Sequence, residues 1–360
     1  MQRILVAMSG GVDSSVTAWL LQQAGYDCAG ATMRLYRNTD IGEACHKSCC
    51  SQTDADDAAD VAFRLGIPFE VLDFTSLFRE RVIRGFLKGY EHGQTPNPCI
   101  DCNRYMKFEV LMDYALREGF DGIATGHYAR IDFDEASGRW RLRKAADESK
   151  DQSYVLYMLT QEQLSRLHFP LGELHKTETR RIAEEQGFIN ARKHESQDIC
   201  FVPDGDYGAF LERWSGKTYP EGDILDLTGK VLGRHRGAVR YTIGQRRGLH
   251  LAMGEPVYVC AKDMERNTVT VGPEEALYCT ELLAGRMNWV SIAEPEEPIR
   301  VTARTRYQQR ETAATAFPLP GGRLRLCFDE PKRAVTPGQA VVLYDGDLVL
   351  AGGTILQAQT

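Results

Sequence analysis

The chain lacks long hydrophobic runs and an excess of positive charge. Its first apolar run, residues 4–8, is too short for a signal-peptide core or a membrane span, and no other uninterrupted run reaches spanning length. Lys and Arg number 43 against 50 Asp and Glu, and the formal net charge of -7 excludes a protein that coats nucleic acid with its whole surface. We therefore expect a soluble, cytoplasmic protein without a membrane partner, in which any RNA contact depends on local basic patches.

Internal repeats, low-complexity segments and a G-x-x-x-x-G-K-[ST] motif are also absent. Without that motif, transfer of the γ-phosphate of a nucleotide is not the expected chemistry. The 360 residues, 43% of them hydrophobic, suffice for two or three domains. Ten cysteines in such a chain are more typical of buried thiols, metal ligands or reactive groups than of a disulfide framework.

Strand-like and helix-like segments alternate over the first two hundred residues. Strand patterns cover residues 3–8, 28–35, 69–74 and 122–125, and helical patterns cover residues 14–24, 54–65, 77–90 and 108–116. The alternation predicts the α/β class, with a doubly wound parallel sheet and helices on both faces, for a first domain over residues 1–204.

The pattern changes after residue 204. Glycine and basic residues become frequent, and we assign residues 205–280 to a small central domain. From about residue 256 short strands and tight turns follow, and we expect a C-terminal antiparallel β-barrel over residues 281–360. The strand patterns of this half cover residues 257–261, 268–271, 323–328, 340–344 and 348–351.

The sharpest local motif is Ser-Gly-Gly-Val-Asp-Ser at residues 9–14, between the first strand and the first helix. Two glycines let the backbone approach a phosphate, and the helix N-terminus offers free N–H groups to an anion. A bare Gly-Gly would suit an ordinary turn, but the complete strand–loop–helix unit favours phosphate binding. These residues resemble the pyrophosphatase-loop ATP enzymes, which cleave ATP between the α and β phosphates and form adenylated intermediates.

Further motifs follow the phosphate loop in order. They are Asn97-Pro98-Cys99-Ile100-Asp101-Cys102-Asn103, Thr125-Gly126-His127-Tyr128-Ala129-Arg130, Lys150-Asp151-Gln152-Ser153-Tyr154, Glu195-Ser196-Gln197-Asp198-Ile199-Cys200-Phe201 and Tyr241-Thr242-Ile243-Gly244-Gln245-Arg246-Arg247-Gly248. Together they resemble the tRNA-uridine 2-sulfurtransferase (MnmA/TrmU) family over essentially the whole chain. The resemblance implies an adenine nucleotide alpha-hydrolase-like fold and an ATP-dependent enzyme. Such an enzyme adenylates the 2-oxygen of the wobble uridine of tRNA and replaces it with sulfur.

The resemblance also assigns roles by position. Cys200 matches the cysteine that carries a persulfide. Cys102 matches the nucleophile that releases the sulfur and forms a disulfide with the first cysteine. The implied ATP-binding positions are Ala7, Met8, Ser9, Gly10, Gly11, Val12, Asp13, Ser14, Met33 and Gly126. The implied contacts with the target base and tRNA are Asn97, Pro98, Cys99, His127, Lys150, Asp151, Gln152, Arg306, Tyr307 and Gln339. ATP with Mg²⁺, tRNAs of the Lys, Glu and Gln type and an upstream sulfur-donor protein are implied as cofactor and partners.

These residue types suit that chemistry. The uridine 2-oxygen is a poor leaving group until AMP is attached to it, and a thiolate or persulfide is the soft nucleophile that would displace it. Two cysteines allow sulfur to be passed on and its carrier to be resolved by thiol exchange, while Mg²⁺ would neutralise the pyrophosphate. Without the motif context, Cys102 and Cys200 would as readily be buried apolar residues.

One loop departs from the common family pattern. That pattern is N-P-D-x-x-C, and Cys99 stands here at the aspartate position. An alternative is that Cys99, Cys102 and Cys200 hold an iron–sulfur cluster with one open iron that accepts sulfide, although C-x-x-C is also a redox or zinc spacing. A second thiol-rich segment, with Cys45, Cys49 and Cys50, would be either a metal site or a surface loop with buried thiols.

Two basic segments are candidates for contact with RNA. No acidic residue lies between Asp226 and Glu255, and Arg300–Arg310 is the second segment, with Tyr307 available for stacking. A solvated basic surface is the alternative for either segment alone. Two other functions stay open: an ammonia-using synthetase with the same loop, which would not need Cys102 and Cys200, and an RNA-binding protein without catalysis.

Overall fold

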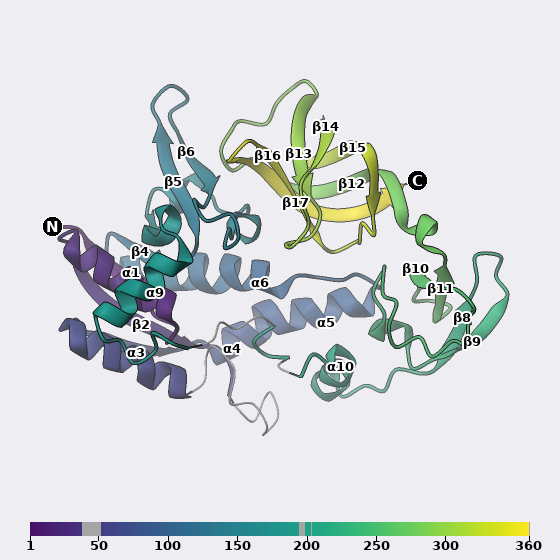
Figure 1. Ribbon diagram of the computed structural model, residues 1–360, viewed down its shortest axis with the longest axis horizontal. Helices are drawn as coiled ribbons and strands as arrows, with labels where there is room; N and C mark the ends of the chain where they lie inside the picture. Colours follow the sequence, from purple (N-terminus) through teal and green to yellow (C-terminus); the bar gives the residue numbers. More distant parts are fainter. Residues whose placement is uncertain (38–51, 194–198, 203, 360) are drawn as a thin grey trace.

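Three β-structures succeed one another along the chain in the computed structural model (Figure 1). The structure describes residues 1–37, 52–193, 199–202 and 204–359. The thiol-rich segment with Cys45, Cys49 and Cys50 lies outside the described residues, as do positions 195–198 of the Cys200 motif. No helix in the described ranges combines the length and the apolar character that a membrane crossing requires.

The first domain is built on a parallel sheet in the order β3-β2-β1-β4-β7. Its strands are β1 (Arg3–Ala7), β2 (Asp27–Arg34), β3 (Phe69–Asp73), β4 (Gly122–Thr125) and β7 (Leu167–His168). Its helices are α1 (Val12–Gln23), α3 (Gln52–Leu65), α4 (Thr75–Phe78), η1 (Arg79–Ile83), α5 (Arg84–Glu91), α6 (Pro98–Asp101), η2 (Cys102–Leu111), α7 (Met112–Arg117), η3 (Ser153–Val155), α8 (Gln161–Leu164), η4 (Pro170–Glu173) and α9 (Lys176–Glu185).

Helices cover both faces of this sheet, as the alternating pattern predicted. Successive strand residues point to opposite faces, so Ile4 and Val6 of β1 pack into the cluster formed with α1, α3 and α9. Leu5, between them, packs into the other cluster, with α5, η2 and α7. The doubly wound α/β prediction is therefore confirmed.

Two predicted helices are longer than their sequence patterns. The pattern at 77–90 corresponds to a continuous segment of α4, η1 and α5, in which η1 is a π-helical stretch. The pattern at 108–116 begins earlier, because α6 continues into the π-helical η2 at Cys102 and then into α7. π-Helical stretches are rare in proteins, and those that occur are often found at functional sites.

The second half of the chain forms a small sheet and a closed barrel. The small sheet has the order β10-β11-β8-β9, and pairing of β12 with β17 closes the barrel strands β12-β15-β14-β13-β16-β17. The predicted antiparallel barrel is confirmed. The elements are α10 (Tyr207–Ser215), β8 (Gly222–Leu225), β9 (Val231–His235), η5 (Ala238–Arg240), β10 (Tyr258–Asp263), β11 (Thr268–Gly272), η6 (Glu274–Leu277), β12 (Tyr278–Asn288), β13 (Ile299–Arg304), β14 (Thr312–Leu319), β15 (Arg323–Arg333), β16 (Ala340–Asp345) and β17 (Leu348–Gln359).

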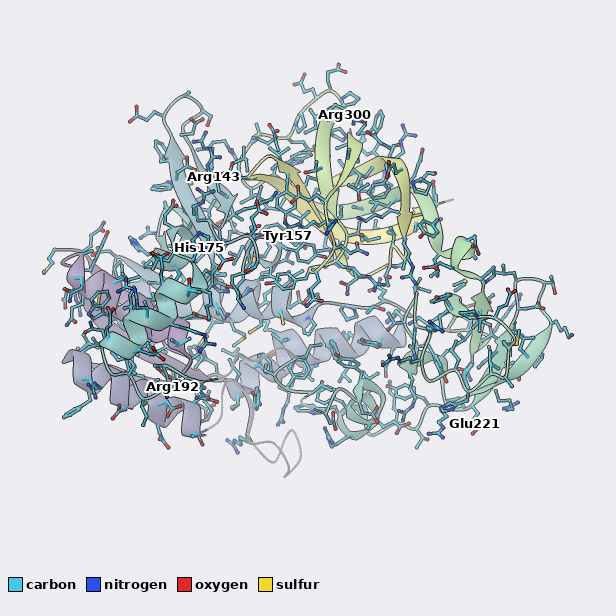
Figure 2. All side chains as sticks on the ribbon, viewed as in Figure 1. Arg143, Tyr157, His175, Arg192, Glu221 and Arg300 are labelled. Atoms are coloured by element: carbon cyan, nitrogen blue, oxygen red, sulfur yellow. The ribbon has the colours of Figure 1, made fainter. Side chains whose placement is uncertain are left out.

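A hairpin of the first domain, β5 (Ala129–Asp134) and β6 (Arg139–Lys144), extends the barrel sheet, and the sequence analysis did not predict it. Leu348 and Val349 of β17 pair with β6. The strands are hard to recognise because they carry many charges. Those charges are paired in the fold. For example, Arg143 forms an ion pair with Asp347 at 2.7 Å, and Figure 2 shows Arg143 on the hairpin beside the barrel.

Candidate active site

The segment between β1 and α1 has the geometry of a phosphate loop. Gly10 has a φ of +70°, and a Cβ there would lie 2.1 Å from the backbone oxygen of Asp54, so only glycine fits. Ser14 Oγ accepts a hydrogen bond from the Ser9 N–H (3.1 Å) and donates one to the Gly11 carbonyl (3.0 Å). Gly11 is the N-cap of α1 and offers no side-chain acceptor to the first turn. The N–H groups of that turn therefore suit an anion.

The loop lies at the carboxyl ends of three neighbouring strands. β1 stands between β2 and β4, where the strand order changes direction, which is the usual place for a ligand in such sheets. A Cβ on Gly126, just after β4, would lie 2.9 Å from the backbone of Asp13 and Ser14. Met33 is buried near the end of β2. The structure thus gathers the predicted ATP-binding positions at one edge, and their contact with ATP stays a prediction.

The carboxylate of Asp13 is held by two buried side chains. Lys176 Nζ lies 2.7 and 2.8 Å from the two carboxylate oxygens, and the Tyr128 hydroxyl donates to Oδ1 at 2.9 Å. The Tyr128 oxygen also lies 3.0 Å from the Thr179 hydroxyl on α9. Lys176 is the first residue of α9 and belongs to no motif that the sequence analysis singled out.

Two side chains from the segment after α9 hold the Gly10 carbonyl of the phosphate loop. The Asn190 amide and Lys193 Nζ donate to it at 3.1 and 3.2 Å. Lys193 Nζ also lies 2.6 Å from Asp54 and 2.5 Å from Asp57 on α3. Sequence reasoning missed Asn190 and Lys193, because these partners are 136 to 183 residues away and leave no local pattern.

The C-x-x-C motif occupies the start of a helical segment. The side-chain amide oxygen of Asn97 accepts from the Cys99 N–H at 3.1 Å as the N-cap of α6, and Pro98 takes the first helical position. Cys99 is exposed and Cys102 is half-buried. Residues three apart on a helix share a face, so the two thiols lie on the same side. Asn97 and Pro98 have a structural role here, and their contact with a base stays a prediction.

Aromatic packing anchors the residue that follows Cys200. Phe201, the next residue, is fully buried with its ring centroid 5.6 Å from that of Phe78. Phe78 ends α4, and α4 packs against η2, which begins at Cys102. Cys102 and Cys200 are both half-buried and border one hydrophobic cluster. The two predicted sulfur-handling positions, 98 residues apart in sequence, therefore border the same hydrophobic cluster, and their direct juxtaposition stays a prediction.

Burial raises the pKa of four other thiols in the chain. Burial raises the pKa of Cys28 and of Cys279 to about 11, which keeps both thiols protonated at neutral pH. Desolvation also raises the pKa of Cys260 and of Cys327. These four cysteines are therefore poor candidates for a nucleophile.

The cluster alternative depends on how Cys99, Cys102 and Cys200 are placed relative to one another. Within the described ranges, which include Cys99, Cys102 and Cys200, no group of three or more His, Cys, Asp or Glu side chains is arranged to hold a metal ion. An iron–sulfur cluster with one open iron needs three converging thiolates. The cluster held by Cys99, Cys102 and Cys200 therefore stays an alternative to the persulfide route.

Three family profiles match consecutive parts of the chain. The tRNA methyl transferase HUP domain matches residues 2–204, the tRNA methyl transferase PRC-barrel domain matches residues 208–273, and the aminomethyltransferase beta-barrel domain matches residues 279–355. Their order agrees with the parallel sheet, the small sheet and the closed barrel.

Curated relatives match over the full length. The tRNA-specific 2-thiouridylase MnmA of Acetivibrio thermocellus is 48% identical, over 98% of this chain and 99% of its own. The same enzyme of Moorella thermoacetica is 51% identical, over 98% of both chains, and that of Pelotomaculum thermopropionicum is 49% identical, over 98% and 97%. The chain belongs to the tRNA-specific 2-thiouridylase MnmA family.

One solved structure with a related name resembles this MnmA-family chain weakly. The U34-tRNA thiolase NcsA from Methanococcus maripaludis, with its [4Fe-4S] cluster, is 18% identical, with a TM-score of 0.35 over 60% of this chain and 71% of its own. That likeness is too low to carry an inference about a cluster here.

The predicted tRNA contact His127 is buried, with 5% of its surface exposed. Its Nδ1 lies 2.6 Å from the Thr125 hydroxyl, and its Nε2 lies 3.4 Å from Lys107 Nζ. Burial, with the nearby Lys107 charge, holds the pKa of His127 well below its usual value. The imidazole is therefore neutral at physiological pH, and a contact with RNA would use a neutral ring.

The Lys150–Gln152 motif of the family is partly used inside the protein. Asp151 is buried, accepts from two backbone N–H groups and pairs with Arg304 at 3.0 Å. The side-chain amide oxygen of Gln152 accepts from the Tyr128 N–H at 2.9 Å. Lys150 is half-buried. Asp151 and Gln152 therefore have structural partners, and the tRNA contacts predicted for the motif stay predictions.

The barrel holds the segment before the C-x-x-C motif. The Thr95 N–H donates to the Pro337 carbonyl at 2.9 Å, and the Gln339 amide donates to the Thr95 carbonyl at 2.6 Å. Gly338, between them, has a φ of +90° and packs on Gln94 and Thr95. Gln339, predicted to contact tRNA, thus joins the barrel to the loop that leads to Cys99.

The other predicted barrel contacts differ in exposure. One guanidinium nitrogen of Arg306 lies 3.0 Å from the Ile243 carbonyl of the central region and 2.8 Å from the Thr336 hydroxyl of the barrel. Tyr307 has 39% of its surface exposed, and its ring lies 6.0 Å from that of Tyr154. Arg306 therefore connects two domains, whereas Tyr307 is accessible to a ligand.

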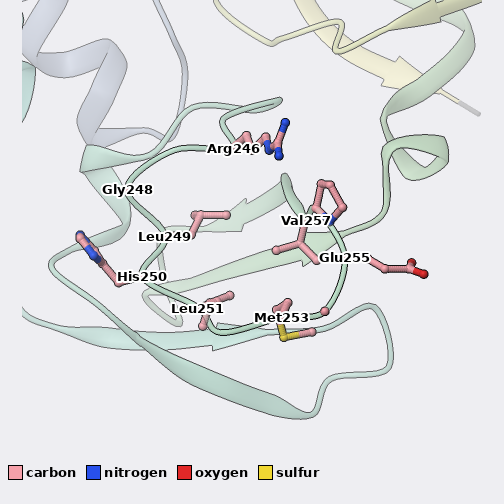
Figure 3. A pocket seen from close by; sticks show the side chains of 10 residues that line it. Arg246, Gly248, Leu249, His250, Leu251, Met253, Glu255 and Val257 are labelled. Carbon is pink, nitrogen blue, oxygen red and sulfur yellow. The ribbon is translucent and has the colours of Figure 1, made fainter.

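The two basic segments differ in how much of their charge is available. In the second segment, Arg300 pairs with Asp329 at 2.5 Å, and Arg304 pairs with Asp151. In the acid-free segment, Arg246 and Arg247 are exposed. A cavity of about 370 Å³ lies beside them in the central region. Figure 3 shows Leu249 and Val257 turned toward the cavity, and Arg246 is also among its lining residues.

Proposed function

We propose that this chain is an ATP-dependent tRNA-uridine 2-sulfurtransferase, a tRNA-specific 2-thiouridylase. The observation that carries the proposal is that the domain with the phosphate loop also holds two half-buried cysteines, Cys102 and Cys200, which border one hydrophobic cluster. The full-length relatives bear the same name. An ammonia-using synthetase with this loop would have no need of either cysteine.

The proposed reaction has two stages. The 2-oxygen of the uridine attacks the α-phosphorus of ATP, and pyrophosphate leaves, which turns the oxygen into part of an AMP leaving group. The Cys102 thiolate then attacks the Cys200 persulfide at its inner sulfur and releases hydrosulfide, forming a disulfide between the two cysteines. The hydrosulfide displaces AMP at carbon 2. A cellular thiol reductant restores both thiols, and a sulfur-donor protein reloads Cys200.

The remaining participants follow from this chemistry. The phosphate loop would bind ATP, with Mg²⁺ on the phosphates. The substrate would be a tRNA of the Lys, Glu or Gln type with its wobble uridine unpaired, and the cytoplasm is the compartment proposed for the reaction. Exposed Arg246, Arg247 and Tyr307 are the described groups best placed to contact RNA.

The first test is the reaction itself. Anaerobically purified protein is incubated with unthiolated tRNA, ATP, Mg²⁺ and a sulfur source, and the digested tRNA is analysed by mass spectrometry. We expect ATP-dependent 2-thiouridine, lost in Cys102→Ser and Cys200→Ser and retained in the control Cys327→Ser. A methylated nucleoside instead, as the profile names would suggest, or no product despite tRNA binding, would contradict the proposal.

Cys99→Asp separates the two sulfur routes. The substitution restores the common N-P-D-x-x-C pattern and removes one ligand of the alternative cluster. If sulfur travels on Cys200, Cys99→Asp retains 2-thiouridine formation within about threefold, because neither reacting thiol changes. Loss of activity together with loss of bound iron and sulfide would favour the cluster held by Cys99, Cys102 and Cys200.

A further inference from the structure

An ion pair closes the base of the barrel loop at residues 305–310, between β13 and β14. Arg304 ends β13 and Glu311 precedes β14, and Nη2 of the arginine lies 3.0 Å from a carboxylate oxygen of the glutamate. Tyr307 and Arg310, within the loop, are exposed. A ring can stack on an RNA base, and a guanidinium can pair with a phosphate. The loop therefore presents RNA-binding groups on a fixed base.

The same ion pair is anchored in the first domain. Nη1 of Arg304 lies 3.0 Å from Asp151, whose side chain is 1% exposed. Lys144, at the end of β6, has its Nζ 2.5 Å from Glu311. The ion network of Asp151, Arg304, Glu311 and Lys144 thus alternates in sign, and its charges cancel. Two of its members come from the first domain and two from the barrel, so the network crosses the junction between them.

Arg304 is too enclosed to bind RNA itself. Its side chain is 16% exposed, and the central carbon of its guanidinium lies 5.1 Å from the ring centroid of the buried Tyr344. Glu311 also accepts from the Thr302 hydroxyl at 2.5 Å. Burial alone would raise the pKa of Glu311, but its bonds from Lys144 and Thr302 hold that pKa below the usual value. The carboxylate is therefore ionised at neutral pH and engaged inside the protein.

The network joins two segments for which tRNA contacts are predicted. Asp151 belongs to the segment 150–154 of the first domain, and Arg304 and Glu311 flank the loop that carries Tyr307. The rings of Tyr307 and Tyr154 lie 6.0 Å apart, so the loop also packs on the end of that segment. The two segments are thus held side by side by charge pairing and by ring contact.

We propose that Arg304 and Glu311 are positioning residues for tRNA, which hold the loop 305–310 at a fixed distance from the segment 150–154. One RNA strand then meets groups of both domains at once. This inference rests on the proposed function, since it concerns how the same enzyme holds its tRNA. Arg304 and Glu311 act through the exposed groups of the loop and do not touch the RNA.

This role predicts an effect opposite in sign to that of simple electrostatics. An acidic residue near bound RNA repels the phosphates, so its removal strengthens binding if charge alone matters. Removal of a positioning acid instead weakens binding, because the loop must then be ordered when the RNA binds. Glu311 is suited to this comparison, since it is the acidic residue at the base of the loop.

The test measures tRNA affinity by filter binding at one fixed salt concentration. Glu311→Gln keeps the size of the side chain but removes its charge, and it should weaken tRNA binding about tenfold. Asp329→Asn is the matched control, because it removes an acid from an exposed pair with Arg300 on the same barrel. This control should bind tRNA at least as tightly as the wild type. KM for ATP should be unchanged in both variants.

A second variant changes no charge. Thr302→Val removes the hydroxyl that donates to Glu311 and should weaken tRNA binding about threefold. If Glu311→Gln does not fold, Thr302→Val decides. Wild-type or tighter tRNA binding by the folded variants, even with a lower melting temperature, would overturn the inference, because it would show a role in stability alone. Wild-type protein that binds no tRNA would instead refute the proposed function.

Discussion

At the scale of the single residue, the surroundings of His127 fix its charge state. Thr125 and Lys107 meet its two ring nitrogens, while Phe108 and Phe169 lie against the ring, with centroids 5.8 and 5.7 Å away. Protonation would place a second positive charge next to Lys107 in a buried site. The residue is therefore suited to accept hydrogen bonds and not to act as an imidazolium.

This arrangement predicts acid sensitivity. The pKa of His127 is lower in the folded than in the unfolded protein. Below about pH 6.5, His127 therefore binds a proton in the unfolded state but not in the folded state. Stability should be flat above that pH and fall as the pH decreases below it. His127→Gln should reduce the slope of the unfolding midpoint between about pH 6.5 and 5, measured by urea titration. Equal slopes in both proteins would contradict the assignment.

Residue types were predicted better than residue partners. The motif context indicated Cys102 and Cys200, and the structure brings both to one cluster. The same reasoning treated Arg300 and Arg304 as available for phosphate, whereas both are paired with carboxylates. A sequence shows which charges exist, but pairing across more than a hundred residues, as for Lys176, depends on the assembled fold.

At the scale of elements, the apolar strands were the most predictable and the charged ones the least. The buried parallel strands are short hydrophobic runs that any reading of periodicity detects. β5 and β6 were missed because their outward charges mask the alternation, and β12 to β14 also lay outside the predicted strands. The contact between the barrel and residues 94–95 was equally invisible in sequence, since it joins segments more than 240 residues apart.

That contact predicts a selective effect of Gly338→Ala. A Cβ there would lie 2.8 Å from Gln94 and 2.9 Å from the Thr95 backbone, and the φ of +90° already disfavours alanine. Displacement of this segment should lower kcat for thiolation about tenfold while KM for ATP stays unchanged. Gly321→Ala, also at positive φ but facing open space, is the matched control. An equal loss in both variants would indicate backbone strain alone.

At the scale of the whole molecule, a protein with a net charge of -7 must attract a polyanion through a few groups. Figure 1 places the central sheet, β8 to β11, at the opposite end of the molecule from α1 and the phosphate loop. Its acid-free segment presents Arg246 and Arg247 to solvent. A long, rigid RNA bound there would reach a catalytic edge far from its main electrostatic contact.

The salt dependence of tRNA binding tests whether the central region supplies the main electrostatic contact. Arg247→Ala should weaken tRNA binding and reduce the slope of log affinity against log salt by about one, since one phosphate contact is lost. Arg300→Ala removes an arginine that Asp329 already neutralises and should leave the slope unchanged. Filter binding from about 50 to 200 mM salt measures both slopes. A reversed order of the two variants would place the RNA on the barrel instead.

The sheet shared by hairpin and barrel limits how such chains can be recombined. β17 pairs with β12 from Gly352 onward. At Leu348 and Val349, β17 pairs with β6 of the hairpin instead. A cut between the profile matches at 2–204 and 279–355 therefore passes between strands of one hydrogen-bonded sheet. The barrel matches a separate family profile, but its sheet is extended by the β5–β6 hairpin of the first domain. Exchanging the barrel between relatives would therefore preserve the fold only if the hairpin were exchanged together with it.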